Sequence, residues 1–543
     1  MVTLVLLVAG GRVVTPDLVY AQRGRAQAPA PGSEAISEAS LRNHLSFIAS
    51  DALEGRLTPS RGLDVAAGYI ASHLARLGLR PAGDPGSYLQ RIALTRRKLD
   101  LENTTLAVGA RTLAYGDDFL PTERPGTAEG AVVYIGNGTV IKSRGVDPYQ
   151  NVDVAGKIVV SNVGLPAGIS QSDLKGRRGE DWEMTEDAAQ RRGAVAVLFL
   201  PDFNTLERWP VSRDTRRTRT TLTVDAFREA GPVLPAATLT ARGVSAIFAG
   251  QQVPPQEAFQ RGLRREPAQP FVLSPATVVR LSVAMADEHL TTSNVVAILE
   301  GSDPALKDEY VAIGAHYDHL GTSAQPNASG DTIYNGADDD GSGTVGMLAM
   351  AEAFAAAKVR PKRSVLFVWH TGEEQGLWGS RYYTEHPTVP LDRIVTQLNI
   401  DMIGRARPAA TSAASSPLAL TDADTVYVVG SRRLSTQLGS ILDQANARGT
   451  GLHLDYSLDD PGNPAQIYER SDHYEYAKHG IPIAFFFTGV HGDYHGLEDE
   501  IEGIDFTKMR RIAQMIYATA RTVADRLDRP RIDAARPVSG ATR

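Results

Sequence analysis

The stretch that decides the fold is YVAIGAH, residues 310–316, read together with SVLFVWH, residues 364–370. Each is a near-continuous apolar run, and residues 343–357 between them are a helix candidate. A buried strand, a helix and a second buried strand predict a parallel pair joined by a helical crossover. Ligands of such sheets bind beyond the carboxyl ends of the strands, so the residues that follow each run are the first to inspect.

The same alternation continues outward from this pair. Further apolar runs are NVVAILEG, VTQLNIDM, TVYVVG and PIAFFFTG, and further helix candidates lie at 376–385, 433–447 and 506–527. Residues 37–80 carry two more helical patterns with an apolar face. We therefore predict an α/β fold with a mostly parallel central sheet, covered by helices on both faces in three layers.

A stretch of different texture interrupts this pattern. Short β-rich runs bounded by glycine begin near residue 125, with an alanine-rich helix candidate at 186–192 and a polar, basic segment at 202–231 that we interpret as an exposed loop. The predicted organisation is a signal peptide and linker, a first part of the main domain, an inserted module, the rest of the main domain and a tail: 1–36, 37–124, 125–275, 276–530 and 531–543.

Composition excludes several classes of protein. The net charge of −7 over 543 residues argues against a nucleic-acid binder, which would carry a basic excess. There is no cysteine, so any metal must be bound by histidine and carboxylate. No apolar run is long enough for a membrane span. The start, MVTLVLLVAGG, followed by VYAQ at 19–22, resembles a secretory signal without a basic beginning, and it predicts an extracytoplasmic location, periplasmic or secreted.

Residues able to bind a metal follow the predicted strands. His316 follows YVAIGA, Glu373 and Glu374 follow SVLFVW, Asp401 follows VTQLNI, and His495 lies in the loop after PIAFFFTGV. Each position alone is weak evidence, because a histidine after a strand is commonly a core or surface residue. Their convergence on one edge of one sheet is much harder to attribute to chance.

The stretch NGADDDGSG, residues 335–343, adds three consecutive aspartates beside the helix candidate 343–357. Several carboxylates in a dry crevice raise one another's pKa and cost free energy unless cations neutralise them. Two histidines and three carboxylates can bind two zinc ions if one carboxylate bridges the pair. An EF-hand fails, because Gly341 at loop position 6 would place Gly336 at position 1 and Met347 at position 12.

The motifs HYDH, NGADDDGSG, TGEEQG, NIDMIG and DYHGLED, in this order, resemble the co-catalytic zinc aminopeptidase family, the aminopeptidase Y and aminopeptidase S group related to glutamate carboxypeptidase. The resemblance covers about residues 37–120 and 290–530, and it implies the zinc-exopeptidase fold with two zinc ions per chain. The inserted segment, with YQNVDVAGKIVV and RRGAVAVLFL, resembles a protease-associated domain.

The resemblance implies a role for each motif residue. One zinc is expected on His316, Asp338 and Asp401, and the other on Asp338, Glu374 and His495, with Asp338 bridging. Asp339 and Asp340 are expected to cap the following helix or to hold the loop. The remaining implied roles are these: Glu373 as general base, Asp318 orienting the His316 ring, and Tyr494, Asp472 and His473 contacting substrate.

Several functions stay open at this point. The leading hypothesis is a metallo-exopeptidase that hydrolyses N-terminal residues from peptide or protein substrates. A glutamate-carboxypeptidase-like enzyme and a glutaminyl cyclase with a single zinc are alternatives, as is an inactive binding protein. His319 stands where the family commonly has serine, and its role is open. The sequence does not indicate the preferred side chain or the oligomeric state.

Overall fold

The computed structural model describes residues 30–228, 234–409, 416–460 and 462–534, and the chain divides into two compact units. The first unit consists of residues up to 91 and from 293 onward, and the second is residues 92–292. The sequence placed the inserted module at 125–275. The difference arises at two long strands, each of which crosses one boundary between the units. These strands are β2 (Leu89–Val108) and β13 (Val278–Leu299). Both strands contain many polar residues, so the hydrophobic pattern of the sequence did not indicate them.

The first unit contains a mixed sheet with a parallel centre. Among the described residues its strand order is β1, β13, β15, β14, β16, β19, β17, β18. The four strands β15, β14, β16 and β19 run parallel to one another, while β13 and β17 are antiparallel to their inner neighbours. Besides β13, the bounds are Arg80–Pro81 (β1), Tyr310–His316 (β14), Ser364–His370 (β15), Ile394–Ile400 (β16), Thr425–Val429 (β17), His453–Asp455 (β18) and Ile483–Phe487 (β19).

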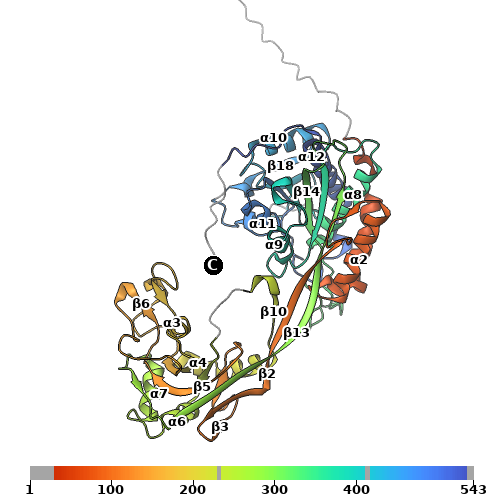
Figure 1. Cartoon of the computed structure of the whole chain (residues 1–543). Coiled ribbons are helices and arrows are strands. Elements are labelled where there is room, and N and C mark those ends of the chain that lie inside the picture. The colour runs from red at the N-terminus through yellow and green to blue at the C-terminus, as the bar shows by residue number, and fades with distance from the viewer. Residues whose placement is uncertain (1–29, 229–233, 410–415, 461, 535–543) are drawn as a thin grey trace, which may run out of the picture. The chain divides into compact units, whose positions relative to one another are not determined.

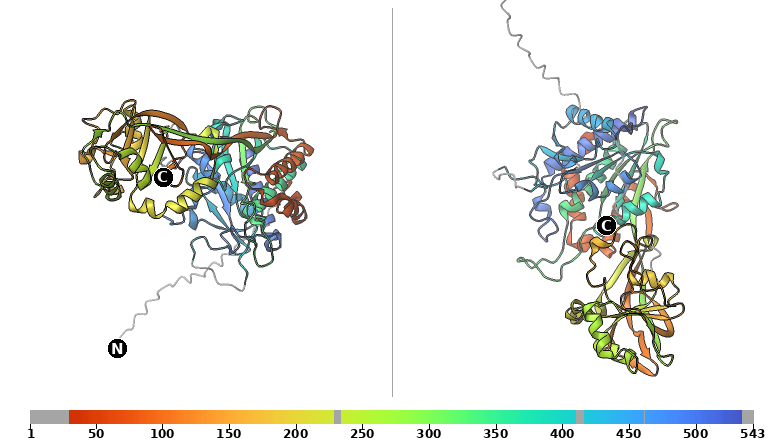
Figure 2. Two further views of the ribbon diagram at one scale, coloured as in Figure 1. Left: turned by 90° about the horizontal axis from the view of Figure 1, so that it is seen from below. Right: turned by 90° about the vertical axis from the view of Figure 1, so that its left-hand side faces the viewer.

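Helices cover both faces of this sheet, so there is one hydrophobic core on each face. Successive side chains of a strand point to opposite faces and therefore pack into different cores. In β14, Val311, Ile313 and Ala315 pack into the core on one face, and Ala312 packs into the other. Figures 1 and 2 show the helices on either side. The first core takes α1 (Glu38–Ile48), α2 (Arg61–Arg76), α8 (Gly343–Ala356), α10 (Thr436–Arg448) and α12 (Phe506–Asp525); the second takes α9 (Trp378–Glu385) and α11 (His473–Lys478).

The predicted α/β fold with a mostly parallel sheet is therefore confirmed for this unit. The helices expected from sequence begin and end close to the predicted residues. Helix α8 is buried along nearly all of its length, which explains why its sequence is apolar on every side. None of the helices in the described ranges combines the length and apolar character that crossing a bilayer requires. The predicted secretory signal lies outside the described residues.

The second unit has a smaller sheet in which β5, β7, β9 and β11 are parallel, with β4, β12 and part of β13 antiparallel at their sides. The strands are Arg111–Leu113 (β3), Phe119–Pro121 (β4), Gly126–Tyr134 (β5), Val140–Ile141 (β6), Ile158–Asn162 (β7), Trp182–Glu183 (β8), Ala196–Leu200 (β9), Thr220–Val224 (β10), Ala236–Leu239 (β11) and Phe271–Val272 (β12). The helices are Thr185–Arg191 (α3), Phe203–Glu207 (α4), Trp209–Thr218 (α5), Ala241–Phe248 (α6) and Pro255–Arg264 (α7).

One prediction for this unit is corrected. The polar segment 202–231 was expected to be an exposed loop, but it contains α4, α5 and strand β10. Neither helix has a buried residue, so no apolar stripe was present in the sequence to reveal them.

Candidate metal centre and adjoining pocket

The residues able to bind a metal lie at the carboxyl ends of the parallel strands. His316 is the last residue of β14, Glu373 and Glu374 follow β15, and Asp401 follows β16. Strand β14 lies between β15 and β16, so the chain leaves β14 and β16 toward opposite sides. This is a topological switch point, where α/β sheets open a crevice for ligands.

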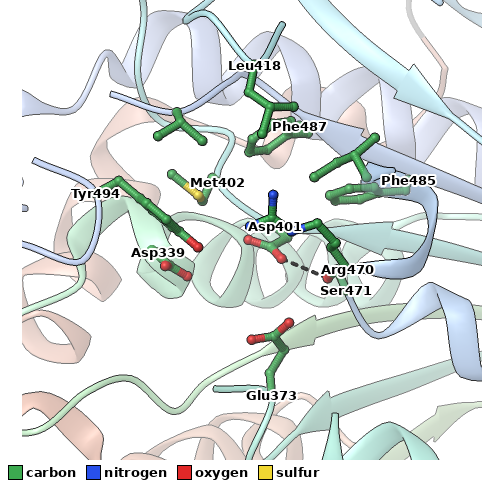
Figure 3. A pocket seen from close by; sticks show the side chains of 12 residues that line it. Asp339, Glu373, Asp401, Met402, Leu418, Arg470, Ser471, Phe485, Phe487 and Tyr494 are labelled. Carbon is green, nitrogen blue, oxygen red and sulfur yellow. Dashed lines mark hydrogen bonds between the residues drawn. The ribbon is translucent and has the colours of Figure 1, made fainter. Parts of the chain in front are cut away.

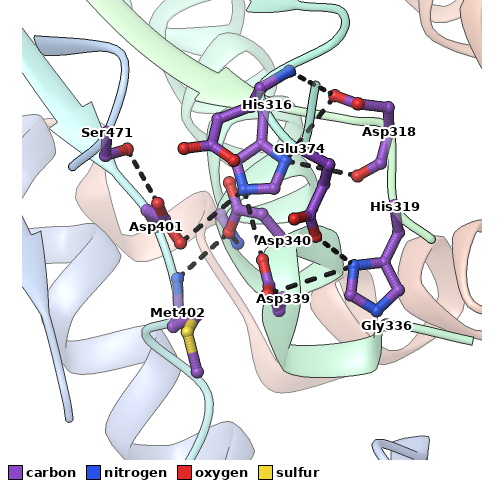
Figure 4. A network of polar contacts seen from close by, with 12 residues as sticks. His316, Asp318, His319, Gly336, Asp339, Asp340, Glu374, Asp401, Met402 and Ser471 are labelled. Atoms are coloured by element: carbon purple, nitrogen blue, oxygen red, sulfur yellow. Dashed lines mark hydrogen bonds and ion pairs between the residues drawn. The ribbon is translucent and has the colours of Figure 1, made fainter. Parts of the chain in front are cut away.

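The first cluster consists of His316, Asp339 and Asp401, all buried. His316 Nε2 lies 3.2 Å from Asp339 Oδ1 and 3.7 Å from Asp401 Oδ1 (Figure 4). Ligands bound about 2.0–2.1 Å from a tetrahedral zinc ion lie about 3.3 Å from one another. The three side chains therefore have the spacing of ligands on one ion.

The second cluster shares Asp339 with the first. Asp339 Oδ2 lies 3.1 Å from His495 Nε2, and Glu374 Oε2 lies 3.2 Å from the same nitrogen. His319 adjoins this group, with Nδ1 2.7 Å from Glu374 Oε1 and 4.0 Å from Asp339 Oδ2. Asp339 thus presents one carboxylate oxygen to each cluster, which is the arrangement that a bridging ligand requires.

The sequence assigned the bridging position to Asp338, and the structure places Asp339 there instead. The buried Asp338 carboxylate points the other way: Oδ1 accepts hydrogen bonds from the Gly404 amide at 2.6 Å and the Ser342 hydroxyl at 2.9 Å. Its Oδ2 lies 3.4 Å from His491 Nε2. Neighbouring residues of this irregular turn direct their side chains to different sides, and sequence spacing alone could not show which one faces the clusters.

Asp340, the third aspartate of the run, caps the following helix as expected. Asp340 Oδ1 accepts the Gly343 amide at 2.9 Å, at the start of α8, and the Met402 amide at 3.1 Å. Asp340 therefore caps the helix and ties it to the Asp401 loop. Asp339, which was also expected to cap, faces the two clusters.

Electrostatics of the protein groups favour added positive charge. Burial alone would lower the pKa of His495, but Asp339 and Glu374 raise it to about 10. Burial would likewise lower the pKa of His316, yet Glu373 and the neighbouring aspartates raise it well above its usual range. Carboxylates that draw protons onto two imidazoles would also draw divalent cations, which displace those protons.

Asp318 supports His316 in a different way from that predicted. The His316 Nδ1 atom lies 3.2 Å from the Asp318 carbonyl oxygen, whereas the nearest Asp318 carboxylate oxygen is 3.8 Å away. The second distance is too long for a direct hydrogen bond. The backbone carbonyl therefore orients the ring, and Asp318 Oδ1 accepts the Glu373 amide at 3.1 Å.

A pocket opens beside the first cluster and is lined by Glu373, Asp401 and Tyr494 (Figure 3). The Tyr494 ring stacks on His495 with centroids 3.9 Å apart. The rest of the lining is mostly apolar and includes Met402, Leu418, Ile467, Phe485, Phe487 and Val490.

Asp472 and His473 were predicted to contact substrate, and the structure corrects this. Both are fully buried and neither lines the pocket. Asp472 Oδ2 lies 3.3 Å from His370 Nδ1, and the His473 ring stacks on Phe485. They start helix α11, which packs beneath the pocket wall, so they support the pocket instead of facing it.

Three residues hold the clusters in place by contacts that sequence reasoning did not identify. Ser471 donates a hydrogen bond to Asp401 Oδ2 at 2.7 Å. Asp499 Oδ2 accepts the amides of Asp338 and Asp339, both at 3.0 Å. Ser471 begins the stretch SDHYEYAKHGIP, residues 471–482, which lies within the range of the family resemblance and could have signalled the first of these contacts.

The third is Arg56, fully buried beneath the clusters. It donates hydrogen bonds to the carbonyls of Tyr317 (2.9 Å), Ile48 (2.5 Å), Asn335 (2.7 Å) and Gly336 (3.0 Å). Burial lowers its pKa to about 10, although four nearby aspartates raise it. Arg56 thus ties together the loops that carry His316 and Asp339.

Replacing Arg56 by methionine should lower the free energy of unfolding by about 3–5 kcal/mol, because four buried carbonyls lose their donors and the aspartates lose a cation. Chemical denaturation with and without zinc measures the change. Arg61→Met, on an exposed residue at the start of α2, is the matched control and should change stability by less than about 0.5 kcal/mol. Equal stability of the two variants would contradict the role assigned to Arg56.

Part of the chain is similar to known peptidases. The model of peptidase family M28 matches residues 294–520. A probable leucine aminopeptidase 2 from Aspergillus oryzae is 34% identical over 221 residues, which is 39% of this chain and 37% of that protein. Leucine aminopeptidase 2 from Trichophyton equinum is 27% identical over 293 residues, 48% of this chain and 51% of that protein. The chain thus spans about half or less of the length of these relatives.

Solved aminopeptidase structures align with more than nine-tenths of this chain. An aminopeptidase from Aneurinibacillus sp. strain AM-1 aligns with a TM-score of 0.44 at 18% identity, covering 93% of this chain and 97% of that one. The zinc aminopeptidase BSAP from Bacillus subtilis aligns with a TM-score of 0.43 at 18% identity, covering 92% and 98%. The residues of both clusters all fall within residues 294–520, the part of the chain that matches the model of peptidase family M28.

Proposed function

We propose that this protein is a two-zinc aminopeptidase that hydrolyses N-terminal residues from peptides. The observation that carries the proposal is the shared carboxylate: Asp339 offers one oxygen to His316 and the other to His495, at 3.2 and 3.1 Å. Two ligand clusters with one common member are suited to a pair of ions that act together.

Zinc fits the donors in both clusters. Each cluster offers one imidazole and two carboxylates, a set that leaves a position open on a four-coordinate ion. Imidazole with carboxylate also accepts other divalent ions, so the choice of zinc is part of the proposal. The similarity to two proteins named as leucine aminopeptidases supports the reaction class.

Two zinc ions would supply a water activated at neutral pH and would polarise the scissile carbonyl. The chain's own residues would handle the protons and the substrate. Glu373, at the pocket wall, would accept a proton from the attacking water and pass it to the leaving amine. The Tyr494 hydroxyl, in the same wall, would donate a hydrogen bond to the developing oxyanion.

The pocket suggests which end of a peptide it accepts. Carboxylates of Asp339, Glu373 and Asp401 line it, and they would attract the free ammonium group of an N-terminus. The apolar remainder of the lining suits a bulky aliphatic or aromatic first side chain. We propose that such residues are released fastest.

One observation favours a second candidate. Arg470 lines the same pocket, and a guanidinium is well suited to recognise a C-terminal carboxylate. A carboxypeptidase of the glutamate carboxypeptidase type would use such a group. A glutaminyl cyclase would need only one zinc, so metal content separates it from both peptidases.

A substrate panel tests the proposal. We expect turnover of chromogenic aminoacyl amides with a free amine, fastest for leucine, methionine or phenylalanine, and none for N-blocked peptides with a free C-terminus. A zinc chelator should abolish the activity and added zinc should restore it. Cleavage of blocked peptides from the C-terminal end would replace the aminopeptidase by the carboxypeptidase.

Two further parts of the proposal rest on sequence alone. We propose export from the cytoplasm, on the apolar start of the chain, and a protease-associated domain within the second unit. N-terminal sequencing of the protein recovered outside the cytoplasm tests the first. A mature chain that still begins at Met1 would contradict cleavage near residue 22.

A further inference from the structure

His319 is a buried imidazole beside the second cluster to which neither the family match nor the proposed mechanism gives a role. The geometry points to His319 as a positioning residue that holds the Glu374 carboxylate so that only one of its oxygens faces the second ion. This inference rests on the proposed two-ion centre.

The distances separate an orienting hydrogen bond from direct metal ligation. His319 Nδ1 lies 2.7 Å from Glu374 Oε1, a length typical of a charge-assisted hydrogen bond. Two atoms on one tetrahedral zinc ion lie about 3.3 Å apart, and the His495 nitrogen meets that spacing at 3.2 Å from Glu374 Oε2. His495 thus takes the ligand position, while His319 holds the other oxygen of Glu374.

Packing fixes the His319 ring in this orientation. The side chain is fully buried, and its backbone amide donates to the Arg56 carbonyl at 3.1 Å. Gly336, with φ of +54°, lies against the ring, and a Cβ there would come within 2.5 Å of His319 Cδ2. The ring is therefore closely packed against the backbone of Gly336.

The hydrogen-bond partners also define the tautomer. A carboxylate acceptor at Nδ1 places the proton on that nitrogen. Within the described residues Nε2 has no hydrogen-bond partner. Among the described residues, the ring thus makes its hydrogen bond through Nδ1 to Glu374, which is a proposed metal ligand. Residues in this kind of position tune metal affinity by about 10–100-fold.

Variants of His319 test the inference by metal binding. His319→Leu removes the donor, and His319→Asn restores an N–H close to the position of Nδ1. His44→Leu is the matched control, because His44 is a buried imidazole on α1 that contacts Tyr69 and Glu352 instead of the clusters. Zinc affinity of each equivalent is measured by competition with a chromophoric chelator, and Co²⁺ absorption spectra report the coordination of each ion.

We expect His319→Leu to weaken one of the two zinc equivalents by about 10–100-fold and to change the spectrum of that Co²⁺ ion only. His319→Asn should restore both to within a few-fold, and His44→Leu should change neither. Two unchanged equivalents in His319→Leu would overturn the inference. So would an asparagine variant that behaves like the leucine variant, since an amide can replace the hydrogen bond but not an imidazole ligand. A wild-type protein that binds at most one ion would overturn the two-ion centre itself.

Discussion

Replacing Glu373 by glutamine should lower kcat for release of an N-terminal residue by about 10²–10⁴-fold, the range that a positioned general base contributes. Glutamine keeps the shape of the side chain but cannot accept a proton. Glu373 lines the pocket beside Asp401, and its backbone amide is held by Asp318. Burial and the charges of Asp401, Asp472 and Glu374 raise the pKa of Glu373 well above its usual range, although His316 lowers it.

The proton-transfer role is separated from metal binding by two measurements on the same sample. Steady-state kinetics give kcat, and elemental analysis gives zinc per chain, which we expect to stay at two. Glu385→Gln, on the exposed end of α9, is the control and should keep turnover within about twofold. Turnover of Glu373→Gln within tenfold of wild type would remove Glu373 from the mechanism.

The second large effect is expected at Asp339. Asp339→Asn should weaken zinc binding by more than about 100-fold, a loss beyond that of orienting residues, because one carboxylate serves both ions. Asp338→Asn is the matched control on the preceding residue. Its amide oxygen can still accept the hydrogen bond from Gly404, so we expect two zinc ions and measurable turnover.

Zinc titration and elemental analysis of the two variants distinguish the assignments. Loss of zinc from Asp338→Asn with full retention in Asp339→Asn would return the bridging role to Asp338. Equal losses in both would mean that the turn as a whole, and not one carboxylate, determines affinity.

The sequence predicted that the candidate side chains lie together at one edge of the sheet. Apolar strands that end in polar residues place those residues on one sheet edge, and the structure brings His316, Glu374, Asp401 and His495 to that edge. This inference succeeds because strand direction and sheet topology follow from hydrophobic runs and crossover rules. It needs no knowledge of how side chains turn.

The parts that sequence could not predict depend on local side-chain direction. Three consecutive aspartates are equivalent by composition, yet Asp338 turns toward Gly404, Asp339 toward the clusters and Asp340 toward the start of α8. Asp472 follows a pocket residue in the chain but is fully buried. Arg56 acts from a segment about 260 residues away from the ligand loops it binds, and no periodicity marks it.

The proposed metal centre holds two ions that share Asp339. Diffraction from crystals of the zinc-loaded protein, recorded at the zinc absorption edge, tests it most directly. We expect two anomalous peaks, one between His316 and Asp401 and the other between Glu374 and His495, each adjoining one oxygen of Asp339. A single peak, or a peak coordinated by Asp338 in place of Asp339, would contradict it.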